Sequence, residues 1–211
     1  MRVSLRPPSN VLRDRVVWQC ASLLLCYPDD VGISCAAELL EGIGGAAADR
    51  LRRTVDALRA AGSLRAATEY VDTFDMNRRA TLYLTYWTAG DTRNRGTAML
   101  EFSSAYRAAG MRPPCGEAPD FLPVVLEFAA TVDAAAGRRL LAAHRVSIDV
   151  LHAALTELRS PYADTVAAVR TTLPAPTDRD AAKATRLVEA GPPAESVGLQ
   201  PFTLTVPPRR T

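Results

Sequence analysis

The residues that could do chemistry in this sequence gather in two short stretches, and the first is GDTRNRG at positions 90–96. Two arginines and an aspartate lie between glycines, directly after an apolar and aromatic run. A phosphate-binding loop of the Walker type follows a strand and ends in glycine, lysine and then serine or threonine, so that its amides and the lysine hold phosphate. GDTRNRG lacks that ending and follows a predicted helix, which argues against nucleotide binding.

The same stretch is better explained as a turn between two helices. Gly90 would end one helix in a left-handed conformation, and Asp91 or Thr92 would cap the next. Capping does not account for Arg93 and Arg95. Those two side chains are expected either in solvent or paired with acids elsewhere in the fold.

The second stretch, GEAPDFLPVVLEF at 116–128, places three acids among prolines. If Asp120 caps the helix that follows, Pro123 falls in its first turn, where no amide hydrogen is needed. Asp120 therefore has two interpretations, a helix cap or a contact with a charged partner. Glu117 and Glu127 are likewise either surface groups or part of an acidic binding site.

The remaining titratable groups do not form a catalytic or metal-binding set. The two histidines, His144 and His152, lie eight residues apart, about two turns along a predicted helix, which is too far to share a ligand without other donors. The four cysteines form no C-x-x-C pair and are expected as free thiols in a reducing compartment: Cys20, Cys26, Cys35 and Cys115. Common catalytic and dinucleotide motifs are also missing. We therefore expect no enzyme activity, no metal and no cofactor.

Composition is that of an ordinary globular protein. Hydrophobic residues make up 48% of the chain and charged residues 23%, and the net charge of +2 gives no general attraction to nucleic acid or anionic lipid. The opening MRVSLRPPSN lacks the pattern of a signal peptide, and the longest apolar run near it, ASLLLCYP, is too short to cross a membrane. We expect a cytoplasmic protein with no nucleic-acid partner and no membrane insertion.

Apolar periodicity predicts an all-α protein, a single globular helical domain of about eight or nine helices with an irregular C-terminal tail. Residues 1–10 are expected as an N-terminal extension and 11–173 as the helical domain. The tail, 174–211, holds seven of the 15 prolines, and only 202–206 within it has an extended pattern.

Two expectations concern the middle of the domain. Residues 79–88 are apolar on nearly all sides, which predicts a short, central, buried helix. Residues 134–158 are expected to form one continuous helix.

Two longer blocks carry a resemblance to a known family. The run YVDTFDMNRRATLYLTYWTAGDTRNRG at 70–96, followed by AYRAAG and then GEAPDFLPVVLEF, resembles the NarJ or delta-subunit family, the assembly chaperones of respiratory nitrate reductase. This family stands with the TorD and DmsD chaperones of complex molybdoenzymes. The resemblance extends over residues 10–160 in order and spacing, and the chain after 174 takes no part in it.

The resemblance implies an all-α cytoplasmic chaperone that performs no turnover itself. Such chaperones bind the apo form of the catalytic (alpha) subunit of nitrate reductase, largely through its N-terminal peptide, and hold it competent for insertion of the molybdenum cofactor. Contact with cofactor-delivery proteins is a further implication. The motif positions imply a client-peptide site drawn from both blocks: Tyr70, Phe74, Asp75, Arg78, Tyr83, Tyr86, Glu117, Pro119, Asp120 and Glu127.

A helical scaffold with clustered aromatics and no catalytic set is suited to receiving an amphipathic helix in a groove. The acids would then meet basic residues of the client peptide and set its orientation. The alternative is a permanent structural or regulatory subunit of the nitrate reductase complex. An enzyme is a third class, and no residue pattern supports it.

Overall fold

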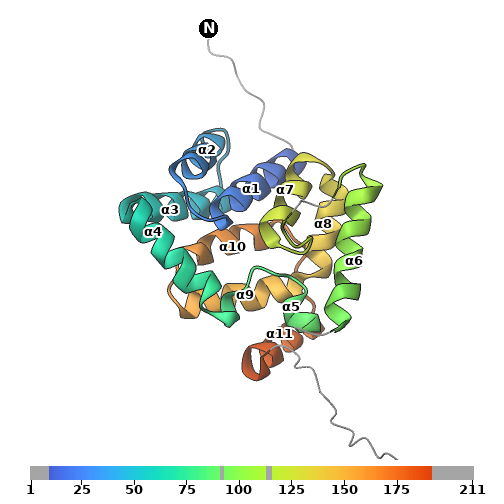
Figure 1. The fold of residues 1–211 in the computed structure, drawn as a ribbon. Helices are drawn as coiled ribbons and strands as arrows, with labels where there is room; N and C mark the ends of the chain where they lie inside the picture. Colours follow the sequence, from blue (N-terminus) through green and yellow to red (C-terminus); the bar gives the residue numbers. More distant parts are fainter. Residues whose placement is uncertain (1–9, 91–92, 113–115, 192–211) are drawn as a thin grey trace, which may run out of the picture.

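The computed structural model describes residues 10–90, 93–112 and 116–191, and these form helices joined by turns (Figure 1). No β-strand occurs within those ranges, which hold a single β-bridge between Tyr83 and Phe121. The predicted all-α class is confirmed. The described helices are α1 (Asn10–Leu25), α2 (Asp30–Glu41), α3 (Ala46–Ala61), α4 (Ser63–Tyr70), a π-helical turn η1 (Val71–Asp75), a 3-10 turn η2 (Arg78–Ala80), α5 (Tyr86–Ala89), α6 (Arg93–Ala108), α7 (Leu122–Thr131), α8 (Ala134–Ala143), α9 (Arg145–Glu157), α10 (Tyr162–Thr171) and α11 (Asp178–Ala190).

Helix α1 lies at the centre of the core and packs against α7, α2, α10 and α3. The indole Nε1 of Trp18 donates to the Thr172 hydroxyl beyond α10 at 2.8 Å. The hydroxyl of Ser22 donates to the Pro123 carbonyl of α7, also at 2.8 Å. Both bonds are buried, so they satisfy polar groups that the core would otherwise leave without partners. They hold α1 against α7 and against the end of α10.

Side-chain caps explain where two of the helices begin. Asp29 Oδ1 accepts from the amide of Gly32 at 2.6 Å at the start of α2. Asp133 Oδ1 accepts from the amides of Ala135 and Ala136, both at 2.9 Å, at the start of α8. These carboxylates satisfy amides that the first turn of a helix leaves without intrahelical partners.

The predicted helix near 79–88 is wrong. The chain there makes a 3-10 turn, an extended stretch and then the four-residue helix α5. The amide of Leu84 donates to the Asp120 carbonyl at 3.1 Å, and the amide of Leu122 donates to the Leu82 carbonyl at 2.9 Å. Leu82 and Leu84 are buried and the residue between them is half-buried. The apolar residues therefore follow the period of an extended chain rather than that of a helix.

Two further boundaries differ from expectation. The predicted helix 134–158 is split into α8 and α9, because the backbone at His144 leaves the helical range, with φ −100° and ψ 22°. The tail predicted to be irregular from 174 contains the helix α11. Thr177 and Asp180 form a reciprocal capping box at its start, a helix-starting signal that the neighbouring prolines obscured. These differences raise the number of helices above the eight or nine predicted.

The other expectations about segments are met in part. Helix α1 begins at Asn10, and residues 1–9 of the predicted extension and the predicted extended piece 202–206 lie outside the described residues. Gly90 has the predicted positive φ, 62°, with an extended ψ of −165°. The predicted caps at 91–92 fall outside the described ranges. No helix in the described part of the chain is both long and apolar enough to cross a membrane.

The tight packing of α8 on α7 predicts that two helical glycines respond differently to substitution by alanine. A Cβ added to Gly137 in α8 would overlap the Ala129 backbone of α7, reaching 3.0 Å from its amide nitrogen and closer still to its Cα. Gly96 in α6 is exposed with open space at the same position. Gly137→Ala should lower the free energy of unfolding by about 1–3 kcal/mol through overpacking. Gly96→Ala should raise it by about 0.5–1 kcal/mol through helix propensity.

Urea denaturation of the two variants and the parent chain measures both changes. Equal or higher stability of Gly137→Ala would show that α7 and α8 are not packed this closely.

Candidate functional site

A buried carboxylate joins the two motif blocks. The side chain of Asp120 has 0% exposure. Its Oδ2 accepts from the amide of Thr85 at 3.1 Å and from the Thr85 hydroxyl at 2.6 Å. The hydroxyl of Ser147 in α9 donates to the Leu84 carbonyl at 2.6 Å. The extended stretch of the first block is thus held by the loop before α7 on one side and by α9 on the other.

Arg95 of α6 completes this arrangement. Its Nη2 lies 3.9 Å from Asp120 Oδ2, and its guanidinium carbon lies 5.1 Å from the centre of the Tyr83 ring. A guanidinium at these separations is attracted both to the carboxylate and to the aromatic face. Of the two interpretations left open for Arg95, pairing with an acid elsewhere in the fold is confirmed. The side chain of Arg93 lies outside the described residues.

Of the two interpretations left open for Asp120, the cap of the following helix is wrong. The N-cap position of α7 is Phe121, which makes no side-chain cap, and a proline occupies the first turn. The Asp120 carboxylate bonds Thr85 instead, because the loop turns it into the core. The neighbouring Pro119 carbonyl accepts from the Tyr106 hydroxyl at 2.7 Å. Pro119 and Asp120 thus anchor the loop, and the Asp120 side chain presents no atoms to solvent.

Tyr70 and Phe74 belong to an aromatic cluster. Their ring centres lie 4.8 Å apart, and they contact Tyr162 of α10 at 5.9 and 5.0 Å. The Tyr70 hydroxyl donates to the Leu25 carbonyl at 3.0 Å. The ring of Tyr27 stands edge-on to Tyr70 at 5.6 Å and is 57% exposed. Buried rings therefore support an exposed one, an arrangement in which a partner can gain apolar contact without disturbing the core.

The π-helical turn η1 sets which neighbours of this cluster reach solvent. The amide of Met76 donates to the Val71 carbonyl at 2.9 Å, five residues back along the chain. A turn of this kind widens the helix by one residue and is often found at functional sites. Phe74 is buried within it, whereas Asp75 and Met76 are exposed.

Acids lie within electrostatic range of Tyr83. Burial is the main cause of the raised pKa of Tyr83, the negative charge of Glu117 adds to the rise, and Arg95 acts in the opposite direction. Asp120 and Asp75 raise the same pKa further. Glu117 and Asp75 come from different motif blocks and are both exposed. The fold therefore brings one acid of each block to the neighbourhood of a half-buried tyrosine.

Three acids lie within electrostatic range of Cys26. Burial is the main cause of the raised pKa of this thiol, and the negative charges of Glu127, Glu117 and Asp29 add to it. We call the surface formed by these exposed acids and two tyrosines the acidic aromatic surface: Tyr27, Asp29, Asp75, Tyr83, Glu117 and Glu127.

The structure groups most, but not all, of the residues predicted to contact a client. Eight of them form the acidic aromatic surface or the buried groups that support it: Tyr70, Phe74, Asp75, Tyr83, Glu117, Pro119, Asp120 and Glu127. Arg78 is exposed on η2. Tyr86 belongs to a different apolar cluster, with Trp87, Val146 and Val150.

Sequence reasoning missed the contribution of the segment after α1. Tyr27 and Asp29 stand in CYPDD, a segment that contains none of the predicted site residues. An exposed aromatic residue beside a proline and two aspartates was the available signal. It had no meaning by itself, because only the fold brings it beside residues 70–83.

An apolar hollow of about 220 Å³ opens between the end of α6 and α7. It shares Glu127 with the acidic aromatic surface, and its lining includes Tyr106, Met111, Val124, Phe128 and Val132. The hollow therefore extends that surface with a recess suited to apolar side chains.

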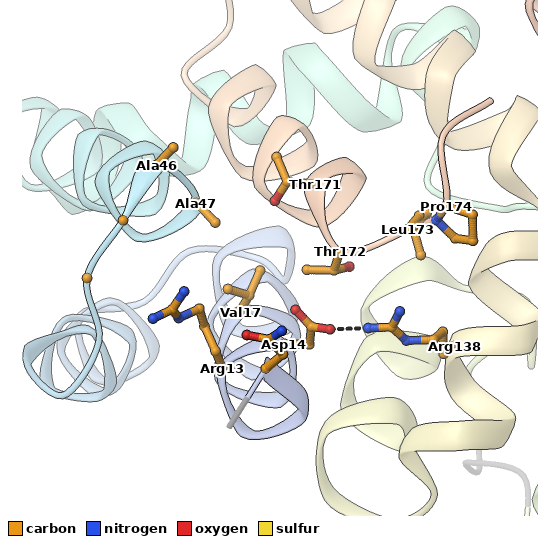
Figure 2. Close-up of a pocket in the computed structure, with 13 residues that line it drawn as sticks. Arg13, Asp14, Val17, Ala46, Ala47, Arg138, Thr171, Thr172, Leu173 and Pro174 are labelled. Carbon is orange, nitrogen blue, oxygen red and sulfur yellow. Dashed lines mark hydrogen bonds and ion pairs between the residues drawn. The ribbon is translucent and has the colours of Figure 1, made fainter. Parts of the chain in front are cut away.

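A more polar hollow of about 520 Å³ lies among α1, α3, α8 and α10 (Figure 2). Asp14 and Arg138 form an ion pair on its wall, and the Arg138 guanidinium also lies 5.6 Å from the centre of a Trp18 ring. None of the predicted site residues lines it. The ion pair joins α1 to α8, which is a structural role.

No group of three or more His, Cys, Asp or Glu side chains in the described ranges is placed to hold a metal ion. His144 packs on Phe102, with ring centres 4.7 Å apart, and the Nδ1 of His152 lies 3.0 Å from Arg170 Nη1. The cysteines predicted as free thiols are confirmed as such at Cys20, Cys26 and Cys35. Cys115 lies outside the described residues.

The buried carboxylate leads to a stability prediction. Asp120→Ala removes both bonds to Thr85 and should lower the free energy of unfolding by about 3 kcal/mol, because hydrogen bonds to charged groups are worth about 1.5–3 kcal/mol each and are not additive here. Asp120→Asn keeps an acceptor for Thr85 and should lose less. Glu117→Ala, an exposed control three residues away, should stay within about 0.5 kcal/mol of the parent. Equal losses in chemical denaturation for Asp120→Ala and Glu117→Ala would contradict the bonding described above.

The histidine between α8 and α9 leads to a prediction about pH. Burial lowers the pKa of His144 from its usual 6.5, although the Glu101 carboxylate, 3.6 Å from Nε2, acts in the opposite direction. The folded state therefore favours the neutral ring, and the resulting stability is present above pH 6.5 and lost as the pH falls below it. NMR titration should place the His144 pKa below 6.5, with the resonance assigned by a His152→Gln variant. A His144 pKa at or above 6.5 would show that the glutamate outweighs burial.

Comparison with known proteins gives the relatives of this chain. A protein-family model described as nitrate reductase delta subunit matches residues 39–168. The nitrate reductase-like protein NarX of Mycobacterium tuberculosis is 66% identical over 154 residues, which are 73% of this chain and 24% of NarX. The chain thus spans about a quarter of that relative. NarJ of Bacillus subtilis, whose name describes a nitrate reductase molybdenum cofactor assembly chaperone, is 30% identical over 159 residues, or 74% of this chain and 86% of NarJ.

Among solved structures, a crystal structure described as a candidate redox enzyme maturation protein of Archaeoglobus fulgidus is similar to this chain. The TM-score is 0.57 and the identity 23%, with 81% of this chain and 98% of the other covered. This similarity concerns the fold, and it agrees with the helical architecture described above.

Proposed function

Because the chain belongs to the nitrate reductase delta subunit family, we propose that it is an assembly chaperone of nitrate reductase. It binds the apo catalytic subunit through the N-terminal segment of that subunit and keeps it competent for insertion of the molybdenum cofactor. The proposal includes a cytoplasmic location and no turnover by the chain itself. The name of the Bacillus subtilis relative describes the same role for that protein.

The observation that carries the proposal is the acidic aromatic surface. Its two tyrosines are exposed or half-buried, and its acids are exposed around them. It continues into the apolar hollow beside Glu127. Apolar contact flanked by negative charge is the complement of an amphipathic helix that carries basic residues.

The energetics of such a contact suit a chaperone. Each apolar anchor that a client helix buries contributes about 2 kcal/mol. Ordering a flexible segment costs about 2–5 kcal/mol of the total. Three or four anchors therefore leave a net gain of a few kcal/mol, which supports a reversible complex. A chaperone requires that reversibility, because it must leave the finished enzyme.

The acids contribute mainly to orientation and to the rate of encounter. Exposed ion pairs are worth about 0.2–1 kcal/mol each, and charge complementarity raises association rates at low salt. Asp75, Glu117 and Glu127 come from three separate segments, so together they mark a direction across the surface. A basic client helix would bind in one orientation more readily than in the reverse orientation.

In this proposal Asp120 and Arg95 are positioning residues. Asp120 is buried and holds Thr85, and Arg95 lies against the Tyr83 ring. They affect client binding indirectly, because they fix the positions of Tyr83 and of the loop that carries Glu117.

The test is calorimetric titration of the full chain with a synthetic peptide of the N-terminal segment of the catalytic subunit. The triple variant Asp75→Asn, Glu117→Gln, Glu127→Gln should weaken binding about tenfold at low salt, or about 1.4 kcal/mol. The peptide affinity of this variant should also depend little on salt concentration, because the charge interactions that salt screens have been removed.

The matched control neutralises three exposed acids on α2 and α3, Glu38→Gln, Glu41→Gln and Asp56→Asn, and so changes the net charge equally. It should bind the peptide within about twofold of the parent, since small surface changes away from the site have little effect. No binding by the parent chain would overturn the proposed function. Equal weakening by both triple variants would assign the effect to net charge rather than to this surface.

A further inference from the structure

Helix α11 is attached to the domain differently from the other helices. None of its residues is buried. Its Ala184 and Leu187 are half-buried, and they pack on a small cluster of Trp87, Val146 and Val150 that is separate from the main core. Figure 1 shows α11 at the lower edge of the molecule, below α9 and α5. The family model ends at residue 168, before this helix begins.

The sequence of α11 carries its own start signal. The reciprocal capping box of Thr177 and Asp180 satisfies its first amides. Pro174 and Pro176 separate it from α10, so the helix is carried on a short stiff linker. Arg145 Nη1 donates to the Pro174 carbonyl at 2.6 Å, which anchors the start of that linker.

The face that α11 turns to the domain is narrow. Ala184, Leu187 and Val188 are spaced i, i+3, i+4, which places them on one side of a helix. Val188 lines a small recess with Trp87, Val150 and Ala154, so the apolar stripe follows α9 towards its end. Outside this stripe the helix is mostly exposed and polar.

The bases of α11 give it the chemistry proposed above for a client. Arg179, Lys183 and Arg186, spaced i, i+4 and i+7, line a single hollow together with Leu187. The helix also carries Asp178, Asp180 and Glu189, so its formal net charge is zero, and its three bases all line that one hollow. The chain thus carries, in its own C-terminal part, an amphipathic helix with a line of bases along one edge, as proposed above for a client.

The cluster beneath α11, which we call the floor, has large apolar side chains that can contact a helix. Trp87 is 2% exposed, and its indole Nε1 has no hydrogen-bond partner among the described residues. Tyr86 lies beside it, with ring centres 5.9 Å apart. Because this cluster is separate from the main core, removing α11 would uncover it without opening the domain.

The floor is also continuous with the acidic aromatic surface. The amide of Tyr86 donates to the Tyr83 carbonyl at 3.2 Å, so the two tyrosines lie on one tight turn. Tyr83 belongs to the acidic aromatic surface, and Tyr86 packs on the cluster that α11 also contacts. The same segment, held by Asp120 and Ser147, therefore supports both surfaces.

We infer that the groove of Tyr86, Trp87, Val146 and Val150 is a second helix-binding groove, which α11 fills in the free protein and yields to a basic amphipathic helix of the client. The inference rests on the proposed function. A tethered helix competes at an effective concentration in the millimolar range. It therefore raises the apparent dissociation constant of the client in inverse proportion to the fraction of chains in which the groove is open.

Peptide titration of two full-length variants tests the exchange. Leu187→Glu places a charge in the apolar contact and should release α11, whereas Ala182→Glu makes the same change of charge at an exposed position of the same helix. Leu187→Glu should bind the client peptide about fivefold to tenfold more tightly than the parent, and Ala182→Glu should match the parent. Fluorescence should shift to the red only in Leu187→Glu, through Trp87, since the other tryptophan, Trp18, is 1% exposed within the core.

Hydrogen exchange on the parent chain gives a readout that needs no variant. Saturating peptide should speed amide exchange in 178–190 while it slows exchange near 83–87. Two outcomes would overturn the exchange: unchanged protection of 178–190 at saturation, or peptide binding by Leu187→Glu that is no tighter than that of the parent. The proposed function would still stand in either case if the parent binds the peptide. Failure of both the parent and Leu187→Glu to bind the peptide would overturn the proposed function and the exchange together.

Discussion

The carboxylate of Asp120 is the group on which the arrangement of this domain's central surfaces depends. A fully buried acid needs partners, since leaving such a charge without them costs far more than a neutral polar group would. The Oδ2 atom of Asp120 accepts two bonds from Thr85 and faces Arg95, whereas Oδ1 has no hydrogen-bond partner among the described residues. Those partners come from the extended stretch before α5 and from α6. One side chain thus ties its own loop to two segments that lie 25 and 35 residues earlier in the sequence.

The same constraint explains which parts of the fold the sequence predicts. The helical class is predicted from apolar periodicity, because buried positions of helices recur at helical spacing. The stretch around Thr85 is predicted as a helix for a different reason, since its run is apolar on nearly all sides and has no clear period. Its real conformation is set by bonds to Asp120 and Leu122, and those partners are distant in the sequence. The resemblance drawn from residues 70–96 and 116–128 is confirmed by the family match.

The candidate site, like the fold, is predicted from the sequence only in part. Motif positions identified Tyr83 and Glu117, and the structure brings them into one neighbourhood. They could not show that Asp120 faces inward, because an acid before a helix has the same sequence pattern whether it caps the helix or is buried. Nor could they show that Tyr27 joins the surface, since that depends on how the end of α1 meets α4. Burial and long-range pairing decide these points, and neither is a local property of the chain.

The π-helical turn at Val71–Asp75 makes the surface sensitive to chain length. A π turn holds one residue more than the corresponding α turn, and each residue of an α-helix advances the side chains by about 100°. Deleting a single residue here would replace the π turn by an α turn and change which residues between Val71 and Met76 face solvent. Such a deletion would change the position of Asp75 even if every residue of the aromatic cluster were kept. In a homologue, the number of residues between Tyr70 and Tyr83 would therefore be as informative about the client surface as their identities.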